Sequence, residues 1–282
     1  MRSVLLDRAN PGRYRYSSSL VCGLALLQCF TAEHQVRGIA EMAEALGLER
    51  STAHRYASTH RELGYLEQTD RRKYRLSAKV LDIGLSMLES IPVRRASREA
   101  LRELRDQTER TACLWVLTEG DVVCIDHWHG SGQGQYEVDA GTGLGTRLPS
   151  YCTAAGKALL ANLPAAERKQ TIRHLCLKRC GPKTLISKAA LLAELERIGV
   201  SAFSADAARS VALEDEEVRA GRRAVAAAIV DKDGQPLAAI QLSAPASKYT
   251  LEQLASRFGP EVAAAAQQIT PRLGSDEVRD NA

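Results

Sequence analysis

The stretch GLERSTAHRYASTHRELGYLEQTDRRKYRL, residues 47–76, decides the fold of the N-terminal part of the chain. Apolar residues at helical spacing predict a helix from about residue 50 to 63, with Ala53, Ala57 and Leu63 on its inner side. GYLEQ and KYRL, on either side of the turn TDRR, predict two short strands. The stretch therefore combines a helix with a polar, basic front and a basic hairpin that follows at once.

The residues before this stretch predict two more helices. SSSLVCGLALLQCF, residues 17–30, has capping serines and leucines at helical spacing, and residues 39–46 have apolar positions at i, i+3, i+4 and i+7. Gly47 ends the second of these helices, as glycine does where the chain turns with positive φ. Two helices joined by a tight glycine turn predict a helix-turn-helix, and the hairpin after them makes it a winged helix.

A helix of this kind can enter a major groove about 12 Å wide while its apolar back stays on the protein. The predicted DNA contacts on its front are Arg50, Ser51, Thr52, His54, Arg55, Ser58 and Arg61. Arg55 would make a bidentate contact to guanine, and the amides of Ser51 and Thr52 would bind phosphate. The predicted wing contacts to the DNA backbone are Arg71, Arg72, Lys73 and Arg75. The alternative is an amphipathic helix whose charges only face solvent.

Composition is compatible with two folded domains and gives no sign of export. The chain has 282 residues, 45% hydrophobic and 26% charged, with a net charge of +4. Its longest apolar run, residues 224–230, is too short to cross a bilayer, and no signal-peptide core is present. Seven cysteines without a C-x-x-C pair suggest neither a disulfide framework nor a zinc ribbon. We expect a cytoplasmic protein with no membrane partner and no cofactor.

The pattern along the whole chain predicts an α+β protein with five parts. These are a basic arm (1–16), a winged helix-turn-helix DNA-binding domain (17–76), a linker helix (77–92), a C-terminal domain (93–272) and a disordered tail (273–282). In the C-terminal domain, helices are predicted at about 93–110, 153–161, 165–177, 188–198 and 251–269. Strands are predicted as a hairpin over 112–128 and at 134–140, 145–149, 223–231 and 236–244.

Three segments carry a resemblance to a known family. They are residues 39–84 (IAEMAEALGLERSTAHRYASTHRELGYLEQTDRRKYRLSAKVLDIG), 152–164 (CTAAGKALLANLP) and 213–245 (LEDEEVRAGRRAVAAAIVDKDGQPLAAIQLSAP). Together they resemble the IclR family of bacterial transcriptional regulators, whose signature Thr-Ala-x-Gly-Lys-Ala matches the second segment. The resemblance implies a winged-helix domain, a linker helix, a GAF-like effector-binding domain, and homodimers that often pair into tetramers. A small effector would then alter how the linkers space two winged helices on operator DNA. Activation and repression both stay open.

The residues around the second segment predict a site for a small, anionic, partly apolar effector. Free amides at the start of the helix near Thr153 favour a carboxylate or phosphate, and the hydroxyls of Ser150 and Tyr151 lie close by in sequence. Apolar wall is expected from Trp115, Leu148, Ala224 and Ala226. The resemblance adds Ala154, Glu214, Gln241 and Ser243 to the predicted effector-binding residues. The alternative is that Thr153 only caps the helix and Tyr151 only packs.

This chain departs from the family at four of these positions. Tyr151 stands where the family often has His, and Glu214 where Asp is common. Ala224 and Gln241 stand where Cys and Ser are frequent, while Ser243 is retained. Small polar groups are thus replaced by larger or apolar ones, so no particular effector can be carried over.

Two pairs of residues have spacings compatible with metal ligation. His127 and His129 would share one side of a strand, and Cys176 and Cys180 would lie one turn apart on a predicted helix. Neither pair has a predicted third ligand, which favours surface or core roles for both. The acidic run at residues 214–217 is typical of solvated surface.

A cysteine-dependent enzyme is the alternative function. Its nucleophile would be Cys152, at a helix N-terminus, or Cys124. No partner base, no G-x-S-x-G elbow and no P-loop can be identified in the sequence. A regulator without enzymatic activity is therefore expected.

Overall fold

The computed structural model describes residues 17–199 and 211–270. The chain forms two compact units that divide between Met87 and Leu88. The predicted basic arm (1–16) and tail (273–282) lie outside the described residues.

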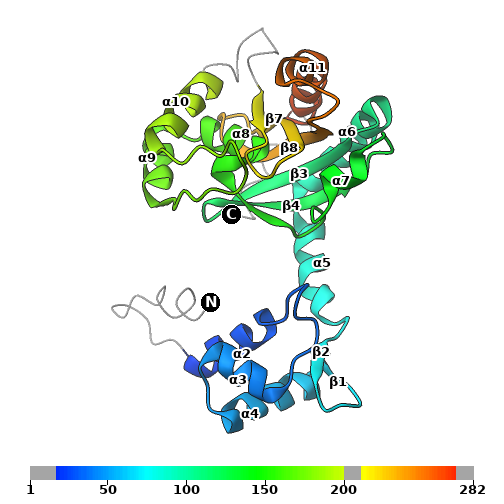
Figure 1. Cartoon of the computed structure of the whole chain (residues 1–282), viewed down its shortest axis with the longest axis vertical. Helices are drawn as coiled ribbons and strands as arrows, with labels where there is room; N and C mark the ends of the chain where they lie inside the picture. The colour runs from blue at the N-terminus through cyan, green and yellow to red at the C-terminus, as the bar shows by residue number, and fades with distance from the viewer. Residues whose placement is uncertain (1–16, 200–210, 271–282) are drawn as a thin grey trace. The chain divides into compact units, whose positions relative to one another are not determined.

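The N-terminal unit is a winged helix-turn-helix, as predicted (Figure 1). Its elements are α2 (Ser18–Gln28), α3 (Ile39–Leu46), α4 (Arg50–Glu62), β1 (Leu66–Gln68) and β2 (Tyr74–Leu76). Gly47 ends α3 with φ 62°, a left-handed conformation that favours glycine. The two strands pair antiparallel with Leu66 opposite Leu76, which makes the wing. A small core of Leu26, Met42, Ala57, Leu66 and Tyr74 holds these elements together.

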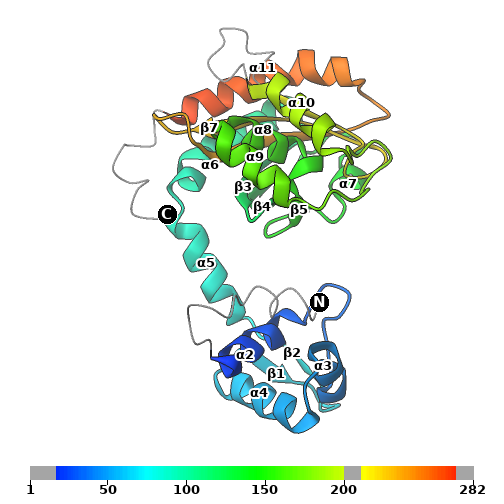
Figure 2. The same cartoon turned by 90° about the vertical axis from the view of Figure 1, so that its left-hand side faces the viewer.

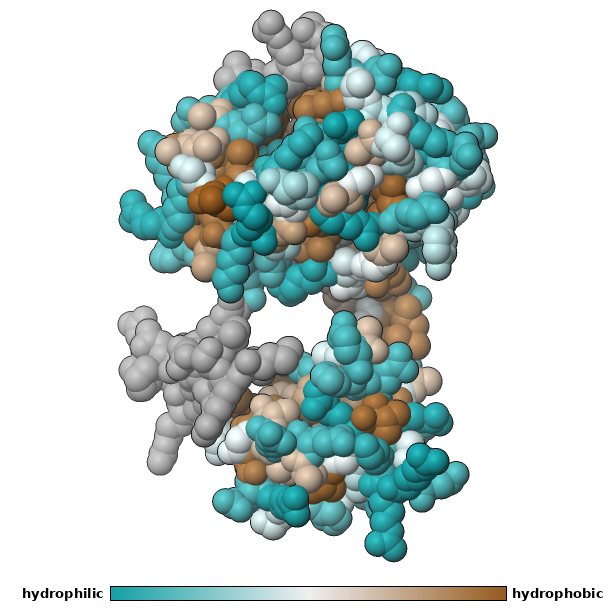
Figure 3. Space-filling view, in the orientation of Figure 1, coloured by the Kyte–Doolittle hydropathy of each residue, from teal (hydrophilic) through white to brown (hydrophobic). Residues whose placement is uncertain are grey.

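The helix α5 (Val80–Ser90) follows the wing and contains no buried residue. Leu81 and Ile83 are 62% and 63% exposed, and Leu85 and Met87 are also exposed. Figure 3 shows the apolar surface gathered along this helix. A polar solvent does not favour so many exposed aliphatic side chains on one helix, so this surface points to a protein contact.

The C-terminal unit is built on a six-stranded antiparallel sheet with the order β5-β4-β3-β8-β7-β6. Its strands are β3 (Thr111–Thr118), β4 (Asp121–Trp128), β5 (Arg147–Pro149), β6 (Ala212–Asp215), β7 (Arg222–Val230) and β8 (Pro236–Pro245). The predicted strands at residues 112–128, 145–149, 223–231 and 236–244 are therefore confirmed, whereas β6 was not predicted.

Helices cover both faces of this sheet (Figure 2). One face packs on α6 (Pro92–Thr108) and α11 (Leu251–Ile269), and the other on α8 (Ala154–Asn162), α9 (Ala165–His174) and α10 (Lys188–Gly199). Alternation along β7 serves both layers, because Val225 and Ala227 enter the first core while Ala224 and Ala226 enter the second.

One predicted element of the C-terminal unit is wrong, and one predicted helix ends earlier than expected. Residues 134–140 were expected as a strand but form the short helix α7 (Gln135–Asp139). Gly134 opens it with φ 78°, and the Gln135 amide donates to Asp139 Oδ1 at 3.0 Å, a local bond that a strand would not allow. The helix predicted to residue 177 ends at His174 with an extended cap residue, so Cys176 and Cys180 are not one helical turn apart.

Candidate functional site

The outer face of α4 has the exposure that a groove-entering helix needs. Ala53 and Ala57 are fully buried against the rest of the unit. Arg50, Ser51, His54 and Arg55 are exposed, while Thr52 and Ser58 are partly buried. The N-cap residue Glu49 makes no side-chain capping bond, so the first amides of α4 are left without that partner. The predicted front and back of the helix thus correspond to its exposed and buried sides, except that Leu63, expected on the inner side, is 52% exposed where the helix ends.

The basic residues predicted to contact DNA differ in whether they form ion pairs within the protein. Within the part of the chain that the structure describes, Arg50, Arg55, Arg71 and Arg72 form no ion pair. The other three cations are paired: Arg61 with Glu62, Lys73 with Glu41 and Arg75 with Glu67, at 2.8–2.9 Å. The unpaired arginines lie on the helix front and at the wing tip, where they are available to a polyanion.

The structure brings the predicted effector residues together on one face of the sheet, under α8. Ala224 lies opposite Glu214 and Ser243, and Ala226 lies opposite Gln241. Cys113 also faces Gln241 across the β3–β8 pair, and Trp115 enters the same core. All members of the predicted set are buried except Leu148, which is partly exposed on the edge strand β5.

The anion-binding groups predicted at the start of α8 already have partners. The Gln241 Oε1 atom accepts a hydrogen bond from the Ala155 amide at 3.1 Å, and Thr153 Oγ1 accepts one from the Gly156 amide at 3.1 Å. The Tyr151 hydroxyl donates to the Lys178 carbonyl at 2.9 Å, and burial raises its pKa to about 12. Ser150 Oγ donates to the Gly120 carbonyl at 2.5 Å. Thr153 thus acts as the N-cap of α8, and Gln241 occupies the position where an anion was expected.

Residues 214–217 were expected on solvated surface, and the structure contradicts this for Glu214 and Glu217. Both side chains are buried, each beside one buried cation: Arg222 Nη1 donates to Glu214 Oε2, and Lys157 Nζ lies 2.5 Å from Glu217 Oε1. Burial raises the pKa of Glu217 to about 7, against the lowering effect of Lys157. Two residues of the acidic run are therefore internal, because Arg222, eight residues further along the chain, pairs with Glu214, and Lys157, 60 residues away, pairs with Glu217.

A buried polar cluster at Asp139 supplies a partner for His129, one of the two histidines considered as metal ligands. Asp139 Oδ1 accepts hydrogen bonds from Gln135 and Ser243, each at 3.0 Å, and Oδ2 accepts one from Thr111. His129 Nδ1 lies 3.1 Å from Asp139 Oδ2. Residues 17–199 and 211–270 contain no group of three His, Cys, Asp or Glu residues placed to hold a metal ion. His129 thus pairs with a carboxylate instead of completing a metal site.

The cysteine expected to act in the alternative enzyme is in a poor environment for a nucleophile. Cys152 is fully buried, and burial raises the pKa of its thiol far above the ordinary value. A thiol attacks as the thiolate, so this environment disfavours Cys152 as a nucleophile. Cys124 is also fully buried, and its Sγ donates to the Asp126 carbonyl at 3.2 Å.

Sequence reasoning missed Arg222, Arg219 and Asp139, which all lie at the end of the sheet face described above. A signal for Arg222 was present, because it stands two and four residues before Ala224 and Ala226 on β7 and so shares their face. Asp139 could not be found in this way, since its segment was assigned to a strand.

No described helix is long and apolar enough to cross a bilayer. A winged helix with unpaired arginines, joined to a second domain built on a helix-covered sheet, is typical of a DNA-binding regulator. Residues 19–70 match the model for the IclR helix-turn-helix domain, and residues 85–271 match that for the bacterial transcriptional regulator IclR C-terminal. The chain therefore belongs to the IclR family of transcriptional regulators.

Individual relatives agree with this assignment. The chain is 30% identical over 246 residues to the p-hydroxybenzoate hydroxylase transcriptional activator of Acinetobacter baylyi, covering 87% of this chain and 88% of that one. It is 28% identical over 258 residues to the HTH-type transcriptional regulator KdgR of Escherichia coli, covering 91% and 93%. The crystal structure of Thermotoga maritima IclR superposes with a TM-score of 0.71 at 25% identity, covering 92% of this chain and all of that one.

Proposed function

We propose that this protein is a homodimeric regulator whose binding to operator DNA is altered by a small anionic effector held in the C-terminal domain. The observation that carries the DNA-binding part is α4, whose front presents the unpaired Arg50 and Arg55 while its back is buried. The observation that supports the effector part is a buried polar row on the sheet face under α8, formed by Glu214, Gln241 and Ser243. Because its target is chromosomal DNA, we propose that it acts in the cytoplasm.

The DNA contacts are tested by selecting operator sequences from random duplexes and then comparing two variants. Arg55→Ala should weaken operator binding about 10- to 100-fold and relax preference at one base pair, because a bidentate contact to guanine discriminates by about 1–3 kcal/mol. Arg71→Ala, the matched control on the wing, should weaken binding to all DNA sequences alike. It should also lower the slope of log affinity against log salt concentration by about one. Binding is measured by fluorescence anisotropy at several salt concentrations.

Each variant can contradict its own assignment. If Arg55→Ala bound the selected operator as tightly as the unchanged protein, α4 would not read the base at this residue. If Arg71→Ala changed sequence preference without changing the salt slope, the wing would not be a phosphate contact.

The dimer is proposed from the exposed aliphatic residues of α5, to which α2 adds Leu20 and Leu24. Replacing Leu81 and Leu85 together by Asp should convert the dimer to a monomer in sedimentation velocity, since charges would be placed in a buried contact. Operator affinity should fall with it, because a dimer binds two half-sites about 34 Å apart. An unchanged sedimentation coefficient would show that α5 does not form the dimer contact.

The effector part is tested with a panel of small metabolites. Calorimetric titration should find an acid that binds. That acid should change the affinity of the protein for operator DNA, and operator DNA should change the affinity of the protein for the acid by the same factor, since linkage is reciprocal. A panel in which only cations or long lipids bind would contradict the anionic class.

A further inference from the structure

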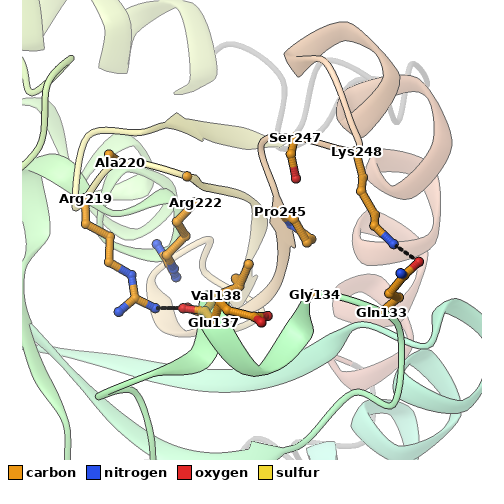
Figure 4. Close-up of a pocket in the computed structure, with 11 residues that line it drawn as sticks. Gln133, Gly134, Glu137, Val138, Arg219, Ala220, Arg222, Pro245, Ser247 and Lys248 are labelled. Carbon is orange, nitrogen blue, oxygen red and sulfur yellow. Dashed lines mark hydrogen bonds between the residues drawn. The ribbon is translucent and has the colours of Figure 1, made fainter.

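A pocket of about 460 Å³ opens at the end of the sheet face that carries the predicted effector residues (Figure 4). It is bounded by α7, the β6–β7 turn and the β8–α11 turn. Polar and charged groups that line it are Gln133, Glu137, Arg219, Arg222, Ser247 and Lys248. Val138 and Pro245 give it an apolar wall.

The guanidinium of Arg222 is incompletely paired although the residue is only 1% exposed. Its Nη1 donates to Glu214, but Nη2 is buried and has no hydrogen-bond partner among the described residues. Figure 4 shows this guanidinium directed toward α7, inside the pocket. A buried charged donor without an acceptor is more unfavourable than a neutral one, so native proteins seldom leave it in this state. The second nitrogen therefore needs an acceptor that the described chain does not supply.

The charges around the pocket favour a monoanion. Glu214 compensates Arg222, and the remaining lining charges are Arg219 and Lys248 against Glu137. The excess is one positive charge, which suits a carboxylate better than a phosphate dianion. Arg219 is close enough to Arg222 that burial, and then this neighbouring charge, lower the pKa of Arg219. A bound anion would relieve the repulsion between the two arginines.

The neighbours of Arg222 connect the pocket to the predicted effector face. Arg222 and Ala224 point to the same side of β7, and Ser243 lies opposite Ala224 on β8. The Arg219 guanidinium donates to the carbonyls of Val138 and Ala140, which keeps α7 over this end of the sheet. A ligand anchored at Arg222 would thus lie under α7, at the open end of the buried polar row.

We infer that this pocket is a carboxylate-binding site, in which Arg222 Nη2 donates to one oxygen of a small monocarboxylic acid and Val138 and Pro245 contact its apolar body. The inference rests on the proposed function, because it places the acid group of the effector at Arg222 and away from the N-terminus of α8.

The site is tested on the full-length protein with benzoate, observed by saturation-transfer NMR, and with benzamide as the uncharged counterpart. Benzoate should bind saturably and benzamide should not. Arg222→Lys retains a cation for Glu214 but removes the second nitrogen, and should weaken benzoate about tenfold or more. Ala220→Phe, at an exposed residue of the pocket wall, should do the same by filling the pocket. Lys232→Gln, on the exposed β7–β8 turn, removes a cation elsewhere and should change nothing.

Three results would overturn the inference. They are the absence of saturable benzoate binding, equal affinities in Arg222→Lys, Ala220→Phe and the unchanged protein, and displacement of benzoate by inorganic phosphate at lower concentration than by acetate. Operator binding is measured on the same samples to separate this inference from the proposed function. If operator binding is altered by an acid whose affinity is the same for Arg222→Lys, Ala220→Phe and the unchanged protein, the proposed function stands and the Arg222 site is wrong. If carboxylates bind at Arg222 but no operator is found, the function fails.

Discussion

Replacing Lys157 with methionine is expected to lower the free energy of unfolding of the C-terminal unit by about 3–5 kcal/mol, the usual cost of breaking a buried ion pair from one side. Lys157 is buried on α8, and its ammonium lies 2.5 Å from Glu217 Oε1 and 3.9 Å from Glu194 Oε1. Without it, the buried carboxylate of Glu217 keeps no cation partner in the described chain. The transition can be followed by tryptophan fluorescence in urea, since both tryptophans, Trp115 and Trp128, belong to this unit.

The deficit of Lys157→Met should grow with pH. Burial already raises the pKa of Glu217 to about 7, above the ordinary 4.5, and removing Lys157 removes its lowering effect. The native state therefore holds this proton more tightly than the unfolded chain, so stability is lost as pH rises from about 4.5 to the folded pKa. Unfolding measured at pH 5 and pH 7.5 should show the smaller deficit at pH 5.

The double variant Lys157→Met/Glu217→Leu is the control for this prediction. Removing both charges together leaves no buried ion unpaired, so most of the lost stability should return. A Lys157→Met protein as stable as the unchanged one at pH 7.5 would contradict a buried ion pair.

The second large effect is expected from Gly156→Ala, which should destabilise the same unit by about 3 kcal/mol, the upper end of typical overpacking costs. An added Cβ at residue 156 would lie 2.2 Å from the Ser150 carbonyl oxygen and 2.4 Å from its Cα atom. These are backbone atoms of the turn before α8, so no side-chain rotation can make room. The turn and the helix would have to move apart, which would also disturb the Thr153 cap. Urea unfolding followed by tryptophan fluorescence measures the effect.

Gly143→Ala is the control. Gly143 lies in the same unit as Gly156, and an added Cβ there meets no atom within 4 Å. The extra methyl group meets no clash, so this variant should change the unfolding curve little. Equal unfolding curves for Gly156→Ala and the unchanged protein would show that α8 and the turn at Ser150 are not in close contact.

Thr153, Gly156 and Lys157 explain why the segment CTAAGK was informative in the sequence. Thr153 caps α8, Gly156 allows the close approach to Ser150, and Lys157 pairs with Glu217 inside the domain. The contacts that residues 153, 156 and 157 make in the structure are packing, capping and charge pairing within the domain. The segment therefore indicates the fold, because the fold needs these three residues for capping, packing and charge pairing. The proposed effector contacts are made by other residues.

The sequence by itself determined the winged helix, because each of its elements has a strong local signal. The apolar period of α3 and α4, Gly47 between them and the turn in the wing all act within a few residues of chain. The outer face of α4 was predictable for the same reason, since helical spacing alone separates Ala53 and Ala57 from Arg55.

Only the tertiary structure decided the polar interior of the C-terminal domain. Glu217 meets Lys157 across 60 residues of chain, and Gln135 meets Ser243 across 108. Such pairs depend on the strand order and on how helices cover the sheet, which hydrophobic periodicity does not encode. The acidic run at residues 214–217 has no local signal that determines its burial. Residues 134–140 have no local preference strong enough to decide between strand and helix. Charge pairing with Arg222 and Lys157 accompanies the burial of Glu214 and Glu217. The bonds of the Gln135 side chain to Asp139 and to Ser243 hold residues 135–139 as a helix over the pocket at Arg222.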